Sequence, residues 1–160
     1  MSRSGYHQEM SGEASSRTVP TNISDRQWIR LILDRLESLS DRSLQLRAWS
    51  GAGPEVWSPC EAADESEDIQ IDLLIQRGTV PLSDGTLASI RQLMRFIGNS
   101  YISDERMGMA ADSPLWIEIR RLAADALDQF VTNIRTTGFG DLTETASAER
   151  LADADRRDPT

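Results

Sequence analysis

The sequence has no lysine, one cysteine and one histidine, and each scarcity excludes a class of site. All 17 basic residues are arginine, a bias that we attribute mainly to GC-rich codon usage and hence to a bacterial source. Cys60 has no second cysteine with which to form a disulfide or a Cys-based zinc site. His7, the only imidazole, precedes the first expected helix, so the domain has no Ser–His or Cys–His pair for nucleophilic catalysis.

Long apolar runs are absent as well. No stretch approaches the roughly 20 apolar residues that a membrane-spanning helix needs. Residues 1–20 have no apolar centre, so we expect no secretory signal peptide. Together with the lone cysteine, these observations predict a cytoplasmic protein without a membrane segment.

The charge is acidic and unevenly distributed. The formal net charge is −9, which argues against binding the phosphate backbone of nucleic acid or an anionic membrane surface. Residues 1–22 sum to 0, 23–50 to +1, 51–80 to −6, 81–137 to −1 and 138–160 to −3. Two-thirds of the net negative charge therefore lies within residues 51–80.

Apolar residues at helical spacing predict one all-α domain, a bundle of four to five helices over residues 23–137. Residues 1–22 and 138–160 are polar or lack an apolar stripe, so we expect a disordered N-terminal tail and a charged, mostly disordered C-terminal tail. Serine caps predict helix starts after Ser24, Ser58, Ser83 and Ser113, and a shorter helix is expected from Ser40. Residues 99–112 are predicted to form a polar loop.

The most unusual segment is EAADESEDIQIDLLI, residues 61–75. Ser58, Pro59 and Glu61 form a capping-box start, so its acids should occupy the early turns of a helix. Residues 68–76 alternate like a strand but also fit a helix, and we favour helix because no second strand candidate exists. An EF-hand loop counted from Asp64 would place isoleucine at its sixth and twelfth positions, where glycine and glutamate are needed. We therefore expect no metal and no cofactor.

The acidic residues suggest a surface for a basic partner. On a continuous helix Glu61, Glu65, Asp68 and Asp72 would form one stripe of like charge, and no arginine within the segment relieves their repulsion. The alternative is an ordinary solvated face, since early-helix acids interact favourably with the helix dipole. A carboxylate pair for hydrolysis stays open on residue types alone, but six acids on a helix are more typical of a solvated face.

Trp57 lies on the loop before this helix. Core packing is one interpretation of its role. An exposed aromatic residue beside a charged patch would instead be typical of an interface hot spot.

Several motifs over residues 25–131 resemble a set of small, all-helical bacterial proteins, some encoded like immunity proteins beside polymorphic or contact-dependent toxins. The matching positions are Leu39–Ser40–Asp41, Gln45, Arg47–Ala48–Trp49, Gly53–Pro54–Glu55–Val56, Ser58–Glu61 and Pro114–Leu115–Trp116. In such proteins the acidic helix usually runs through apolar residues into an Asp-Asp step, whereas residues 63–68 here are almost wholly polar. The resemblance implies a non-catalytic protein that binds and blocks a toxin domain.

We therefore expect an immunity protein that neutralises a basic toxin domain through an acidic surface, without enzyme activity. The alternatives are a structural or regulatory bundle, either monomeric or homodimeric through the last helix, and a carboxylate hydrolase. The predicted partner-binding residues are Trp57, Glu61, Asp64, Glu65, Glu67, Asp68 and Asp72.

Overall fold

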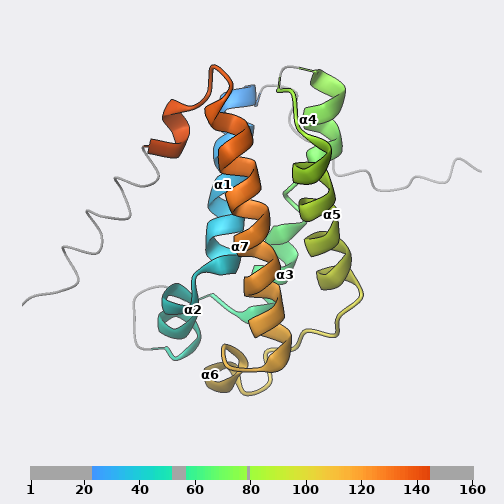
Figure 1. The fold of residues 1–160 in the computed structure, drawn as a ribbon. Coiled ribbons are helices and arrows are strands. Elements are labelled where there is room, and N and C mark those ends of the chain that lie inside the picture. The colour runs from blue at the N-terminus through green and yellow to red at the C-terminus, as the bar shows by residue number, and fades with distance from the viewer. Residues whose placement is uncertain (1–22, 52–56, 79, 145–160) are drawn as a thin grey trace, which may run out of the picture.

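The structure is a computed structural model that describes residues 23–51, 57–78 and 80–144 (Figure 1). These ranges contain seven helices and no strand, so the predicted all-α class is confirmed, with more helices than the four to five expected. Predictions for residues 1–22, 52–56 and 145–160 lie outside the described residues. The helices are α1 (Asp25–Ser40), α2 (Arg42–Trp49), α3 (Pro59–Ser66), α4 (Ile71–Arg77), α5 (Asp84–Gly98), α6 (Met107–Ala110) and α7 (Pro114–Arg135).

Helix α7 lies between α1 and α5 and packs along both (Figure 1). Both neighbours run antiparallel to it. Arg26, at the start of α1, pairs with Asp141, which follows the end of α7. At the start of α5, the Ser83 amide donates a 2.6 Å hydrogen bond to the Asn133 side chain near the same end of α7.

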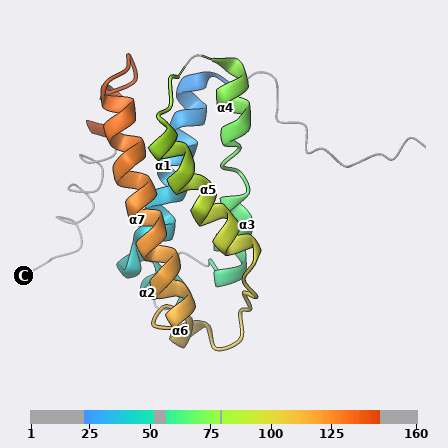
Figure 2. The same cartoon turned by 45° about the vertical axis from the view of Figure 1, so that its right-hand side comes forward.

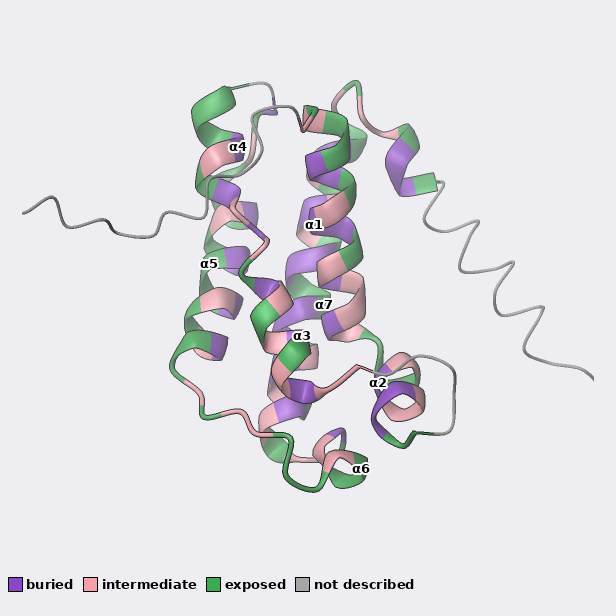
Figure 3. Cartoon of the chain, turned by 180° about the vertical axis from the view of Figure 1, so that it is seen from behind, coloured by how far each residue is buried: buried purple, intermediate pink, exposed green. Residues whose placement is uncertain are grey.

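A fourth rod closes the bundle and consists of two short helices in succession, α3 and then α4 (Figure 2). Figure 3 shows α3 in front of the space between α1 and α5, with α7 behind. Arg77 at the end of α4 bonds to the Ile23 carbonyl oxygen beside the start of α1, at 2.8 Å, so this rod runs antiparallel to α1. Helices α2 and α6 are short additions at the opposite end of the bundle (Figure 1).

The core is formed by the apolar faces that the helical spacing predicted. Aliphatic and aromatic side chains of the three long helices are fully buried, which is the main source of stability in such a bundle. The most deeply buried are Ile29, Ile32 and Leu36 of α1, Ile90 and Leu93 of α5, and Ile119, Ala123, Ala126, Phe130 and Ile134 of α7.

The predicted serine caps are confirmed. Ser24, Ser58, Ser83 and Ser113 each accept a hydrogen bond from a backbone N–H in the first turn of the helix that follows. The short helix expected from Ser40 begins instead at Arg42, because Asp41 supplies its cap through a 3.0 Å bond from the Leu44 amide.

The rod formed by α3 and α4 differs from the single acidic helix predicted after Ser58. The helical geometry expected for residues 68–76 is confirmed for Ile71–Arg77, but the chain leaves the helix between Ser66 and Ile71. Here the amides of Gln70 and Ile71 bond to carbonyl oxygens only two residues back, at 2.9 and 3.0 Å. Ile69 and Ile71 are both buried, and two residues so spaced would lie on opposite faces of an unbroken helix. The break lets both Ile69 and Ile71 reach the core.

Two predicted loop or tail segments are also more structured than expected. The loop 99–112 contains the short helix α6, which begins after Arg106 in a left-handed backbone conformation. The folded chain continues past the predicted domain end at residue 137, since Leu142 and Thr143 are buried and Phe139 packs against the core. These residues cover the end of the bundle, where Asp141 pairs with Arg26.

Candidate functional site

The predicted stripe of Glu61, Glu65, Asp68 and Asp72 does not form, because the chain leaves the helix between Ser66 and Ile71. Glu65 and Asp68 turn toward the bundle. Their carboxylates lie 3.2 and 3.1 Å from the guanidinium nitrogens of Arg35, on α1. We call Glu65 and Asp68 the inner acidic pair. Sequence reasoning found no relieving arginine because it considered only the segment itself, whereas Arg35 lies 30 residues before Glu65 and meets it through the fold.

Trp57 is half-buried and packs against the core, which agrees with the core-packing interpretation rather than with an exposed hot spot. Its indole N–H donates a 3.2 Å hydrogen bond to the same Glu65 oxygen that Arg35 contacts. Its ring lies 5.9 Å from that of Trp49, which in turn lies 4.7 Å from that of Trp116. Three of the four tryptophans thus form one aromatic cluster beside the inner acidic pair.

Asp72 belongs to a different part of the surface. It lies in the first turn of α4, where its carboxylate is 3.2 Å from the guanidinium of Arg91 on α5. Both side chains are more than half exposed, so the pair contributes little to stability.

The remaining three acids, Glu61, Asp64 and Glu67, are exposed and recur every third residue along α3 and its C-cap. That spacing keeps them on one side of the helix. We call them the outer acidic row. Glu61 also closes the capping box by accepting a 2.8 Å bond from the Ser58 amide. The row is the part of the predicted acidic surface that the fold leaves facing solvent.

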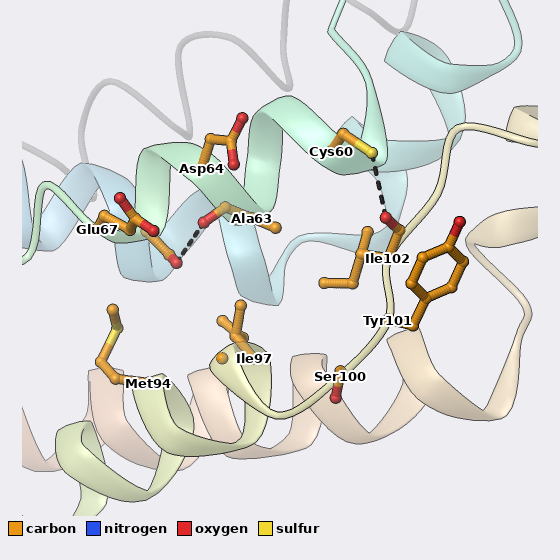
Figure 4. Close-up of a pocket in the computed structure, with 11 residues that line it drawn as sticks. Cys60, Ala63, Asp64, Glu67, Met94, Ile97, Ser100, Tyr101 and Ile102 are labelled. Carbon is orange, nitrogen blue, oxygen red and sulfur yellow. Dashed lines mark hydrogen bonds between the residues drawn. The ribbon is translucent and has the colours of Figure 1, made fainter.

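Beside the outer acidic row runs a groove of about 390 Å³ between α3 and the end of α5 (Figure 4). Its apolar lining includes Ala63, Met94, Ile97 and Ile102, and its rim includes Asp64 and Glu67. Tyr101 stands at one end of the groove with 90% of its surface exposed. Among the described residues that line the groove there is no arginine.

Cys60 lies at the end of this groove, where its thiol donates a 3.3 Å hydrogen bond to the Ile102 carbonyl oxygen (Figure 4). The pKa of the thiol is raised, first by burial and then by the neighbouring Asp104 carboxylate. The Cys60 amide donates a 2.9 Å bond to Asp104, which lowers the pKa of that carboxyl group. Burial and Asp104 therefore favour the neutral thiol of Cys60 over its thiolate.

Sequence reasoning missed the half of the groove that comes from α5 and the residues after it. Met94 and Ile97 looked like core positions of a helix, and Tyr101 and Ile102 stood in a polar loop. Tyr101 and Ile102 are an aromatic and an aliphatic residue side by side in that polar loop, and this pair was the one sign of the groove in the sequence. Only the fold places the pair opposite α3.

Two general features can be reported of the described ranges. They contain no group of three or more His, Cys, Asp or Glu side chains that could hold a metal ion. None of their helices combines the length and apolar character needed to cross a bilayer.

Comparison with models of protein families, with curated proteins and with solved structures finds no match to this chain. The functional argument therefore rests on the geometry and charge of the site.

Proposed function

We propose that this chain is a non-catalytic interaction protein, an immunity protein that binds and neutralises a cationic toxin domain. The observation that carries the proposal is the outer acidic row of Glu61, Asp64 and Glu67, exposed along one side of α3. The row adjoins a groove with an apolar lining, so charge and apolar surface lie together. That combination is expected of a protein-binding surface.

The electrostatic role of the six acids differs between the inner and outer positions. Arg35 offsets part of the charge of the inner acidic pair, and Arg91 part of that of Asp72. These acids still contribute to the negative field of the segment, which steers a basic partner and raises its association rate. The outer acidic row is the part that contacts the partner directly.

The proposed toxin partner follows from the resemblance of residues 25–131 to immunity proteins and from the acidic charge. Many secreted toxins that cleave nucleic acid are basic, and an acidic protein blocks them by charge complementarity. The net charge of −9, concentrated around α3, supports a partner of this kind.

The alternative, a homodimer through the last helix, has less support. Helix α7 uses two of its sides to pack on α1 and α5. Among the large hydrophobic residues of α7 only Ile117 is exposed, and it is followed by the ion pair of Glu118 and Arg121. We therefore advance no second function.

The test is neutralisation of the toxin domain encoded beside this chain in its genome. Growth of cells that express the toxin is measured with the wild-type protein, with Asp64→Arg/Glu67→Arg, and with Asp125→Arg/Asp128→Arg. The last variant makes the same charge change at exposed positions of α7, on the opposite side of the bundle from α3 (Figure 3).

We expect the wild type and the α7 variant to protect the cells. The α3 variant should associate with the purified toxin at least tenfold more slowly at low salt, with unchanged helicity by circular dichroism. Protection that is equal for both double variants, or a locus without a toxin, would contradict the proposal.

A further inference from the structure

We propose that the groove between α3 and α5 receives a short segment of the partner in which an arginine or lysine lies next to an aliphatic side chain. This inference rests on the proposed function, because it names how a cationic protein would engage the α3 surface. Four features of the groove support it: the volume, the apolar lining, the acidic charge and the exposed aromatic residue.

The size of the groove fits a few side chains. About 390 Å³ lies at the lower end of the range of roughly 300–1,000 Å³ that is typical of ligand pockets. The groove is therefore too small for a whole helix but large enough for an aliphatic side chain and part of its neighbour.

The lining favours an aliphatic group. Ala63 projects from α3, Met94 and Ile97 from α5, and Ile102 from the segment after α5 (Figure 4). Met94 and Ile102 are only partly buried, so part of their apolar surface is left for a ligand to cover. The flexible thioether of Met94 can adjust to the shape of the side chain that enters.

The polar groups of the groove favour a cation over an anion. Asp64 and Glu67 supply carboxylates among the residues that line the groove. The hydroxyl groups of Ser66 and Ser100 donate to the Ala63 and Phe96 carbonyl oxygens, at 2.5 and 2.6 Å, so they are not oriented toward an anion.

Tyr101 completes the groove at its open end. Tyr101 is 90% exposed, which is unusual for an aromatic residue that lines a groove. A cationic group of the partner that lies over the tyrosine ring would make a contact that strengthens the binding of cations.

The experiment is an NMR titration of the full-length, isotope-labelled protein with two synthetic hexapeptides. One alternates leucine and arginine, and the other has glutamate in place of arginine. We expect the arginine peptide to shift the amide signals of Ala63, Ile97 and Ile102, with weak affinity, and the glutamate peptide to leave them unchanged.

Two matched variants separate the contributions of charge and apolar contact. Asp64→Asn/Glu67→Gln should weaken the arginine peptide about tenfold, and Met94→Gln, which keeps the length of the side chain, about threefold. Asp125→Asn/Asp128→Asn on α7 should have no effect.

Several outcomes would overturn the inference. These are equal binding of both peptides, shifts confined to other surfaces, or no loss on Met94→Gln. Concentration-dependent shifts of the groove signals without peptide would also overturn it, because they would identify a second copy of this chain as the occupant.

The inference and the proposed function can fail separately. If the toxin is neutralised equally by the wild type and by Met94→Gln, and the peptide does not bind, the function stands and the groove assignment fails. If the arginine peptide binds the groove but no toxin is neutralised, the groove assignment stands and the immunity function fails.

Discussion

The two sides of this bundle differ in the length of their helices and in the contacts that hold them. Helices α1, α5 and α7 have 16, 15 and 22 residues and bury continuous apolar faces against each other. On the other side, α3 and α4 have 8 and 7 residues, are separated by an irregular turn, and are linked to the long helices by Arg35, Arg77 and Arg91.

This difference separates the part of the chain that supplies stability from the part that carries the proposed binding surface. Apolar burial gains most from long, regular faces, whereas short helices depend on caps and on contacts with their neighbours. The α3–α4 rod can therefore carry acidic residues at its surface without weakening the core that holds it. Three experiments test this difference between the two sides.

The largest effect is expected from shortening one leucine on each side. Leu93 on α5 and Leu74 on α4 are 0% and 1% exposed, so the change to alanine is chemically the same at both sites. We expect Leu93→Ala to lower the free energy of unfolding by about 4 kcal/mol and Leu74→Ala by about 2 kcal/mol, because the shorter helix can relax into the space. Urea unfolding, followed by circular dichroism, measures both.

Hydrogen exchange provides the control for that pair. Amides of α4 should exchange faster than those of α5 and α7 in the wild type, and Leu74→Ala should widen the gap. Equal losses of stability together with equal exchange would show that the α3–α4 rod is as much a part of the core as the long helices.

A smaller effect is expected from the arginine that holds the inner acidic pair. Arg35→Met keeps the aliphatic stem but leaves Glu65 and Asp68 facing each other without their counter-charge, which should cost about 1–2 kcal/mol of unfolding free energy. Arg91→Met removes only the exposed pair with Asp72 and should cost less than about 0.5 kcal/mol. If thermal and urea unfolding give the same loss for both, the α3–α4 rod does not depend on Arg35.

The smallest effect concerns the thiol of Cys60. Its pKa is raised, so a smaller fraction is thiolate at any given pH, and alkylation by iodoacetamide should reach half its maximal rate at a higher pH than for a free cysteine. Asp104→Asn should move that midpoint down, since it removes the neighbouring negative charge. Because deprotonation is easier in the unfolded chain, the contribution of this group to stability is present at neutral pH and is lost as the pH rises through the raised pKa.

Alkylation in urea is the reference for this experiment. There Cys60 should behave as a free cysteine in the wild type and in the variant. A folded-state midpoint that matches the urea value would mean that α3 does not hold the thiol against Ile102 and Asp104.

Much of the fold could be predicted from the sequence because its signals are local. The caps at Ser24, Ser58, Ser83 and Ser113 act within four residues of themselves, and the apolar spacing of α1, α5 and α7 reflects the period of a single helix. The helix break at residues 67–70 has no glycine or proline to mark it. It is set by the burial of Ile69 and Ile71 in a core that the whole bundle provides.

The site could be predicted only in part, because its residues meet across the chain. The acidic segment was evident, and its exposed members Glu61, Asp64 and Glu67 were among the predicted residues. Whether an acid turns inward depended on Arg35, and the groove depended on Tyr101 and Ile102, none of which lies near α3 in the sequence. The order of residues within one segment does not show which distant residues the segment meets in the fold.

The long packing contact between α1 and α7 has a consequence for synthesis of the protein. The apolar face of α1 is complete when Ser40 has been made, but the helix that covers it ends only at Arg135. At roughly 5–20 residues per second, that delay amounts to about 5 to 20 seconds on the ribosome. During this interval Trp28, Ile32 and Leu36 have no α7 to pack against, so newly made chains should be clients of ribosome-associated chaperones until the last helix emerges.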